Sequence, residues 1–314
     1  MEGKGVGVSG KEAVEMAEAT RPAAAVDGVN WGNGGKEKGG ANLVSLFVQN
    51  YMGLSFPGDD TPLRLLWGQE TIEERVLGLT FQVSPRSFFQ VNTKGCERLY
   101  RKVIQNLTLG DDITVLDVCC GAGTIGLCAA KEGGARKVIG VEISASAVED
   151  ARSNARANNV SNAEFVCDRA EKALQRLLHE AGKSHASQVL SGTLSSSPIK
   201  FAAIVDPPRA GLMAPCLRAL RSCTAIERLV YVSCNPTKSL VNDSVLLCGP
   251  SSKKTKGAPF RPVKAIPVDM FPHTNHTELI MVFERFEPEP STEGEGEEGE
   301  EVAAGTAQEV AAKS

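Results

Sequence analysis

The sequence predicts an α/β protein built on a doubly wound sheet of parallel strands. From residue 92 onward, short apolar runs alternate with longer segments of helical periodicity. The apolar runs are continuous, which is typical of parallel strands that helices cover on both faces. A glycine-rich turn at 121–126 follows one of these runs, as in folds that bind ligands at the carboxyl ends of their strands.

The individual elements follow from these patterns in chain order. A helix is indicated where apolar residues recur every three or four positions, and a strand where a short apolar run lies between turn residues. Two serine- or lysine-rich stretches, 182–200 and 249–261, are expected to be solvated loops. Helices are predicted at 94–106, 124–131, 145–158, 171–181 and 214–225, and strands at 113–118, 137–141, 163–167, 201–205, 229–233, 263–268 and 279–285.

The chain before residue 92 has a different character. Residues 1–41 hold too few large apolar side chains for a core and are expected to be disordered, apart from one short helix at 11–20. Residues 42–91 are predicted to form a partial small β subdomain, with strands at 42–50, 63–68 and 75–83. Two or three strands do not form a stable domain alone, so we expect this subdomain to pack on the main domain, residues 92–286.

Composition excludes several classes of protein. The 314 residues contain no apolar run of the roughly 20 residues that a membrane span requires. The nine cysteines include no CxxC pair, which disfavours a zinc or iron–sulfur site, and their odd number disfavours a disulfide scaffold. The amino terminus lacks the apolar core of a signal peptide, so a reducing compartment, cytoplasmic or nuclear, is expected.

Charge is unevenly distributed along the chain. The formal net charge is −4, but residues 287–314 carry nine glutamates and a single lysine, and are expected to be a disordered acidic tail. The remaining residues, 1–286, hold 33 basic and 29 acidic side chains. A mildly basic body is compatible with a polyanionic partner but does not require one.

The glycine turn indicates a ligand site. Gly121, Gly123 and Gly126 follow an apolar strand and match the pattern GxGxxG. Glu142 ends the next strand, where its carboxylate can accept hydrogen bonds from two ribose hydroxyls. This spacing suits NAD and S-adenosylmethionine (SAM) equally. It therefore predicts a nucleotide-like ligand without selecting between these two, and a bare glycine turn is the alternative.

Two further strand ends carry polar groups. Asp206, Pro207, Pro208 and Arg209 follow the strand at 201–205, and the two prolines would direct Asp206 into the same crevice. Enzymes that methylate exocyclic amines often carry an aromatic residue after such prolines, and Arg209 in that place disfavours an amine target. A purely structural turn explains this segment equally well.

Cys234 follows the strand at 229–233 and is therefore placed for nucleophilic attack at that edge. Most cysteines are small buried side chains, and we assign the other eight to packing. His273, His276 and Glu278 lie in the segment before the last strand. They lack a familiar metal-ligand spacing, and Glu278 could instead act as a base whose pKa burial raises.

Six segments together resemble the SAM-dependent RNA uracil-5-methyltransferases. The resemblance covers residues 75–286 and is most specific in SFFQVN, VSCNP and the histidine-rich segment before Glu278. It implies the SAM-dependent methyltransferase form of the Rossmann-like sheet. The segments are SPRSFFQVNT (84–93), VLDVCCGAGTIGL (115–127), VIGVEISASAVEDARSNARANN (138–159), IVDPPRAGL (204–212), LVYVSCNP (229–236) and FRPVKAIPVDMFPHTNHTEL (260–279).

The resemblance implies roles for particular residues. Cys234 would attack C6 of uracil, and Glu278 would remove the proton from C5. A thiolate needs a lowered cysteine pKa, which a nearby cation, either the SAM sulfonium or Arg209, could provide. Asp206 would also face the uracil, and Asp168 is a further cofactor candidate. SAM would be bound by Gln90, Cys119, Gly121, Thr124, Glu142 and Asp206.

The resemblance also implies partners and leaves alternatives. The substrate would be tRNA with an exposed uracil, bound by a monomer without metal. Lysines and arginines at 253–264 would contact phosphates or form a merely solvated loop; they are Lys253, Lys254, Lys256, Arg261 and Lys264. Relatives carry more sequence at the amino-terminal side, so a non-catalytic RNA- or SAM-binding remnant is one alternative. An NAD-dependent dehydrogenase is the other.

Overall fold

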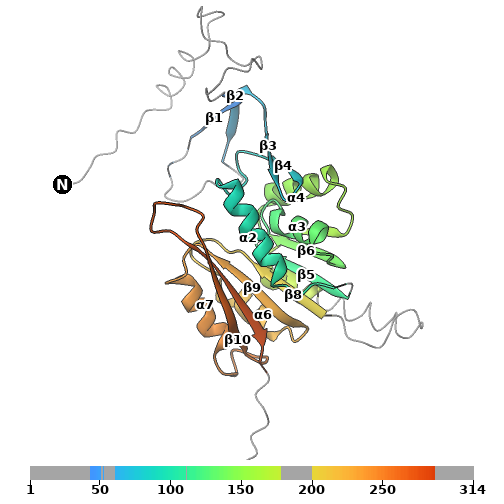
Figure 1. Cartoon of the computed structure of the whole chain (residues 1–314), viewed down its shortest axis with the longest axis vertical. Coiled ribbons are helices and arrows are strands. Elements are labelled where there is room, and N and C mark those ends of the chain that lie inside the picture. The colour runs from blue at the N-terminus through green and yellow to red at the C-terminus, as the bar shows by residue number, and fades with distance from the viewer. Residues whose placement is uncertain (1–42, 51, 53–60, 111, 178–199, 287–314) are drawn as a thin grey trace, which may run out of the picture.

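A computed structural model describes residues 43–50, 52, 61–110, 112–177 and 200–286 (Figure 1). The helix predicted at 11–20, the loop at 182–200 except for its last residue, and the acidic tail at 287–314 lie outside the described residues. The helix predicted at 171–181 is described as far as residue 177 and is helical from 170 to that point.

The main body is a seven-stranded sheet with the order β10-β11-β9-β8-β5-β6-β7. Five neighbouring strands are parallel, from β9 to β7, whereas β11 runs antiparallel to β9 and β10 antiparallel to β11. The α/β class is confirmed. The strands are β5 (Ile113–Val118), β6 (Lys137–Glu142), β7 (Ala163–Cys167), β8 (Lys200–Val205), β9 (Ile226–Ser233), β10 (Phe260–Val268) and β11 (Glu278–Arg285).

The prediction that all strands run parallel is wrong for β10 and β11. A parallel neighbour requires a crossover connection of a dozen residues or more, and only residues 269–277 join these two strands. They therefore form a hairpin at the end of the sheet. Pro262 and Pro267 are accommodated because β10 is an edge strand, where a missing backbone donor costs no ladder bond.

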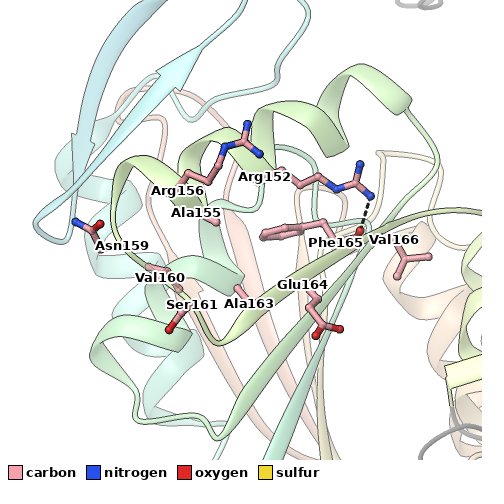
Figure 2. Close-up of a pocket in the computed structure, with 10 residues that line it drawn as sticks. All are labelled: Arg152, Ala155, Arg156, Asn159, Val160, Ser161, Ala163, Glu164, Phe165 and Val166. Carbon is pink, nitrogen blue, oxygen red and sulfur yellow. Dashed lines mark hydrogen bonds between the residues drawn. The ribbon is translucent and has the colours of Figure 1, made fainter.

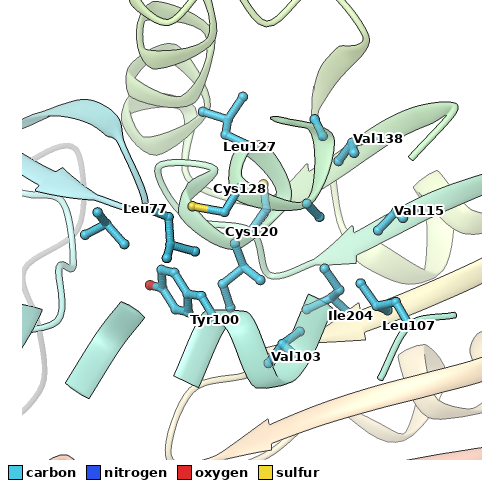
Figure 3. Close-up of a cluster of buried hydrophobic side chains, with 14 of the residues drawn as sticks. Leu77, Tyr100, Val103, Leu107, Val115, Cys120, Leu127, Cys128, Val138 and Ile204 are labelled. Carbon is cyan, nitrogen blue, oxygen red and sulfur yellow. The ribbon is translucent and has the colours of Figure 1, made fainter. Parts of the chain in front are cut away.

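Helices cover both faces of the sheet. On β8, Ala202 and Ile204 join the core beneath α2, α3 and α4, while Ala203 and Val205 join the core beneath α6 and α7. Figure 3 shows part of the first core, where Tyr100 and Val103 of α2 lie near the glycine turn and β5. The helices are α2 (Thr93–Gln105), α3 (Thr124–Glu132), α4 (Ala145–Ala157), α6 (Ala214–Ser222) and α7 (Ser239–Cys248).

Two local predictions differ from the structure. The segment at 75–83 was expected as one strand, but Leu77 and Gly78 have φ of 50° and 75° and turn the chain back on itself. Positive φ at both positions is typical of the two-residue hairpin turn, here between β3 (Ile72–Val76) and β4 (Leu79–Val83). Helix α7 was not predicted, because its first half, SLVND, favours helix weakly.

The amino-terminal strands form two small antiparallel pairs. β1 (Ser45–Gln49) pairs with β2 (Leu63–Gly68), and β3 pairs with β4. Val76, Leu79 and Phe81 of the second pair belong to the main core. The expectation that this region packs on the main domain is therefore met for the β3–β4 hairpin.

A row of polar side chains on α4 and at its C-cap, Asn158, holds the β3–β4 hairpin. Asn158 accepts a hydrogen bond from the Thr80 N–H at 2.9 Å, and Asn154 accepts one from the Gln82 N–H at 2.8 Å. One helical turn earlier, Asp150 accepts hydrogen bonds from the hydroxyls of Ser84 and Ser87. Positions four apart share one helix face, so these three side chains satisfy the free edge of β4 and the loop that follows it.

Candidate active site at the carboxyl edge of the sheet

The pairing of β9 with β11 brings Cys234 and Glu278 together. Leu279 pairs with Ser233 in an antiparallel register, so the next residues outward are Glu278 and Cys234. Cys234 is exposed, whereas Glu278 is only 5% exposed. A thiol and a carboxyl group distant in sequence therefore meet at the end of the sheet where the parallel strands finish.

The electrostatic surroundings of Cys234 oppose ionisation. Partial burial, followed by the charges of Glu278 and Asp206, raises the pKa of the thiol, and the nearby positive charge of Arg209 opposes this rise. Arg209 therefore lies within electrostatic range of the sulfur, as expected. The lowered pKa that a thiolate nucleophile needs is not present in the free protein.

Asp206 lies at the same edge, directly after β8. Its backbone N–H donates to the Val118 carbonyl at 3.3 Å, which continues the β8–β5 pairing beyond the last strand residue. Burial, and then the charge of Glu278, raises the pKa of the Asp206 carboxyl to about 8. Burial alone raises the pKa of Glu278. Asp206 is consequently protonated at neutral pH and able to donate a hydrogen bond.

The glycine turn approaches Glu142 closely. Cys119, Gly121 and Gly123 all have positive φ, between 52° and 77°, so the chain winds tightly between β5 and α3. The Glu142 carboxylate accepts hydrogen bonds from the Gly121 N–H at 3.1 Å and from the Ser144 N–H at 3.0 Å. The Cβ position of Gly121 faces open space, so this backbone is accessible to a ligand.

The turn is held from beneath by Asp117. Its Oδ2 atom accepts the Gly126 N–H at 2.9 Å, and a Cβ at Gly126 would lie 2.6 Å from that oxygen. Only glycine fits there, which explains the third glycine of the motif. Burial raises the pKa of Asp117 to about 7, and its Oδ1 atom is buried without a hydrogen-bond partner.

The segment that contains Gln90 lies against the loop before Glu278. Gln90 is 6% exposed. The side chain of Asn92 caps α2 by accepting the Gly95 N–H, and its amide donates to the Met270 carbonyl at 3.1 Å. The sequence prediction did not include Asn92, although an asparagine just before a helix is a recognised capping signal.

Two other predicted cofactor residues are engaged within the protein. The Thr124 hydroxyl lies 3.0 Å from the Tyr100 hydroxyl, and the pair is buried. Asp168 forms an ion pair with Arg176 at 3.3 Å, and its backbone N–H donates to the Glu142 carbonyl. Ile143, which was not predicted, is 68% exposed directly after Glu142 and offers an apolar surface there.

The basic loop before β10 and the histidine-rich segment before β11 lie at opposite ends of the β10–β11 hairpin. Lys253–Lys256 precede β10, whose first residue, Phe260, pairs with Arg285 at the far end of β11. An eight-residue strand separates that end from Glu278, a distance of roughly 23 Å. The basic loop therefore lies at the opposite end of these strands from Glu278.

Among the described residues, His273 and His276 included, no three potential metal ligands form a cluster.

A groove of about 730 Å³ lies apart from this edge, between α4 and β7. Figure 2 shows Arg152 and Arg156 on α4 beside Phe165 and Glu164 on β7. Arg152 donates to the Phe165 carbonyl at 2.9 Å. The groove contains none of the predicted site residues.

Within the described ranges, no helix is both long and apolar enough to cross a membrane.

Fold and site together define a Rossmann-like protein with a nucleotide-type ligand site and a cysteine beside a carboxyl group at one edge. The family model for "tRNA (Uracil-5-)-methyltransferase" matches residues 62–285. The chain belongs to this family, as the resemblance indicated. This membership removes the support for the dehydrogenase alternative.

Individual relatives agree with the family. The chain is 42% identical over 257 residues to mouse tRNA (uracil-5-)-methyltransferase homolog A, covering 82% of this chain and 39% of the relative. It is 46% identical over 226 residues to the human homolog A, covering 72% and 33%. The chain therefore spans about a third to two fifths of the length of these curated relatives.

A solved structure also matches the fold. It is that of Pyrococcus abyssi tRNA (uracil-54, C5)-methyltransferase in complex with S-adenosyl-L-homocysteine. The TM-score is 0.53 at 30% sequence identity, and the match covers 76% of this chain and 50% of that one. The methyltransferase form of the sheet is thereby confirmed.

Proposed function

We propose that this chain transfers a methyl group from SAM to C5 of a uracil in tRNA. The observation that carries the proposal is the placement of Cys234 beside Glu278 at the edge that also holds the glycine turn. Family membership supports the substrate class, and the archaeal relative solved with S-adenosyl-L-homocysteine supports the methyl donor.

The residues around the glycine turn fit a nucleoside such as SAM. Gly121 leaves its backbone open to a ligand, and the Glu142 carboxylate has lone pairs left to accept ribose hydroxyls. Gln90, Cys119, Thr124 and Asp206 complete the proposed binding set. When bound, SAM supplies an electrophilic methyl carbon on a sulfonium.

Cys234 supplies the nucleophile that makes uracil reactive. The exposed thiol first loses its proton to solvent, and the resulting thiolate adds to C6, which forms an S–C6 bond and moves the C5–C6 π electrons into an enolate. C5 of this enolate then carries the electron density that takes the methyl group. Protonated Asp206 donates a hydrogen bond to a uracil carbonyl, which stabilises the negative charge as it develops.

Glu278 completes the reaction as the base. Its carboxylate takes the proton from C5, the electrons of the C–H bond re-form the C5–C6 double bond, and the Cys234 thiolate leaves. The burial that raises the Glu278 pKa makes it a better proton acceptor than an exposed carboxylate. The uracil must leave its base stack to reach this edge, so a loop or flipped nucleotide is the expected target.

A double-label assay tests the proposal. The full chain is incubated with methyl-tritiated SAM or with tRNA tritiated at uracil C5, so that methyl incorporation and tritium release are followed separately. We expect both in equal amounts from the wild type and neither from Cys234→Ala. Methyl incorporation that persists in Cys234→Ala would overturn the mechanism.

The second candidate is a non-catalytic RNA- or SAM-binding protein. The observation that favours it is the raised pKa of the Cys234 thiol, which disfavours the thiolate in the free protein. Binding of tRNA and S-adenosylhomocysteine by the wild type, with no incorporation of methyl groups, would establish this alternative in place of the enzyme.

A further inference from the structure

Asp243 is a buried carboxyl group that the proposed mechanism does not use. It lies on α7 and is 5% exposed. One of its oxygens, Oδ2, accepts the Tyr231 hydroxyl at 2.6 Å and the Leu212 N–H at 2.8 Å. Tyr231 belongs to β9, and Leu212 belongs to the loop after Asp206. Asp243 therefore joins α7 to β9 and to the loop after Asp206, and β9 and this loop adjoin Cys234 and Asp206 at the proposed active site.

The loop between Asp206 and Leu212 is shaped to accept this carboxylate. Gly211 has a φ of 85°, and a Cβ there would lie 2.9 Å from Asp243 Oδ2. The Gly211 N–H donates to the Pro208 carbonyl at 2.8 Å, which closes the loop into a tight turn. Glycine is thus required both by the backbone conformation and by the close approach of Asp243.

A second contact fixes the same loop from the nucleophile side. The Asn235 side-chain amide donates to the Arg209 carbonyl at 3.2 Å, and Asn235 directly follows Cys234. Arg209 therefore lies between two attachment points, Asn235 on one side and Asp243 on the other. Its side chain is exposed, and the backbone contacts fix the point from which it extends.

We propose that Asp243 is a positioning residue: it fixes the loop at 207–212 against the end of β9 and thereby keeps the Arg209 charge close to the Cys234 sulfur. The functional importance of this role rests on the proposed function. The geometry does not, since it concerns only contacts within the chain.

The balance of charge at Cys234 explains why this matters. Glu278 on β11 and Asp206 after β8 disfavour the thiolate, and Arg209 favours it. Above the Asp206 pKa of about 8, two carboxylates thus oppose one cation, and below that pH the Glu278 carboxylate alone opposes Arg209. If the loop were released, Arg209 would move freely in solvent and its effect on the sulfur would be screened.

Alkylation of the free protein tests this positioning without RNA or SAM. The rate of iodoacetamide modification at Cys234 is followed by peptide mass spectrometry between pH 6.5 and pH 10. We expect Asp243→Ala to move the pH profile of Cys234 to higher pH and to slow its alkylation at pH 8 by about threefold to tenfold. Cys167, also exposed, reports in the same samples and should not change.

Matched variants separate positioning from general stability. Asn242→Ala changes an exposed neighbour on the same helix, and Asp243→Asn retains an acceptor for Leu212, so both should keep the wild-type profile. Tyr231→Phe removes one partner of Asp243 and should give a smaller shift in the same direction, which keeps the test decisive if Asp243→Ala does not fold. The inference would be overturned if every one of Asp243→Ala and Tyr231→Phe that folds kept the wild-type pH profile of Cys234 alkylation. Failure of methyl transfer in the double-label assay would leave this result untouched.

Discussion

Asn154 joins the amino-terminal hairpin to the glycine turn. Its side-chain amide donates to the Ala122 carbonyl at 3.3 Å, while its oxygen accepts the Gln82 N–H at 2.8 Å. The side chain is fully buried. One asparagine on α4 therefore couples the segment that leads to Gln90 with the turn that faces the proposed methyl donor.

Replacement of Asn154 by alanine should therefore weaken both folding and ligand binding. It leaves one buried and one partly buried backbone group without this partner, and we expect a loss of about 1–3 kcal/mol in the free energy of unfolding. Urea denaturation measures this loss, and calorimetry should show weaker binding of S-adenosylhomocysteine. Arg156→Ala, an exposed change on the same helix, is the control and should alter neither quantity by much. Equal stability of the two variants would contradict this role.

Glu142→Ala should reduce affinity for S-adenosylhomocysteine by about 10- to 100-fold, the range for lost hydrogen bonds to a charged group. The side chain would no longer accept ribose hydroxyls or hold the Gly121 N–H. Calorimetry gives the affinity directly. Glu149→Ala on the α4 surface serves as the control. Wild-type affinity in Glu142→Ala would place the ligand elsewhere.

Asp206 should make the folded protein less stable as pH rises. Its pKa is about 8 in the folded protein and near 3.8 as a free side chain, so the folded state binds a proton that the unfolded state releases. Stability contributed by this proton is present at pH 4 and lost as the pH rises toward 8. Asp206→Asn removes this loss. We expect the variant to match wild type near pH 4 and to exceed it by about 5 kcal/mol at pH 8, since the pKa difference is about four units. Urea denaturation at both pH values decides, and an equal difference at both would contradict the assignment.

Glu278→Gln should stop the reaction after methyl transfer. Without a base for the C5 proton, the methylated uracil remains attached to Cys234. We expect a covalent protein–tRNA complex on denaturing gels, with methyl label but little tritium release. Its absence under conditions in which wild type turns over would exclude Glu278 as the base.

Much of the main domain could be predicted because its signals are local. The continuous apolar runs at β5 and β8 indicate strands buried on both faces between helices. The turn with Gly121 and Gly123 requires positive φ, which glycine adopts readily. The directions of β10 and β11 were harder to predict from the sequence. The antiparallel placement of β11 beside β9 depends on a hairpin connection that periodicity does not reveal.

The candidate site was predicted less completely than the fold. Cys234 and Glu278 could be proposed from strand ends and family resemblance, and the sheet places them side by side. Asn154 and Asp243 could not be proposed, since each acts through contacts with segments remote in sequence. Leu77 misled the prediction because a large apolar residue rarely adopts positive φ.

Trapping with 5-fluorouridine tests the central claim most directly. A base cannot abstract fluorine from C5 in the way that it abstracts a proton. A tRNA that contains 5-fluorouridine should therefore remain covalently attached to the enzyme after methyl transfer. With SAM present, we expect mass spectrometry to find one methylated 5-fluorouridine attached to the peptide that contains Cys234. Attachment to any other residue, or no attachment by a wild-type protein that methylates ordinary tRNA, would contradict the account.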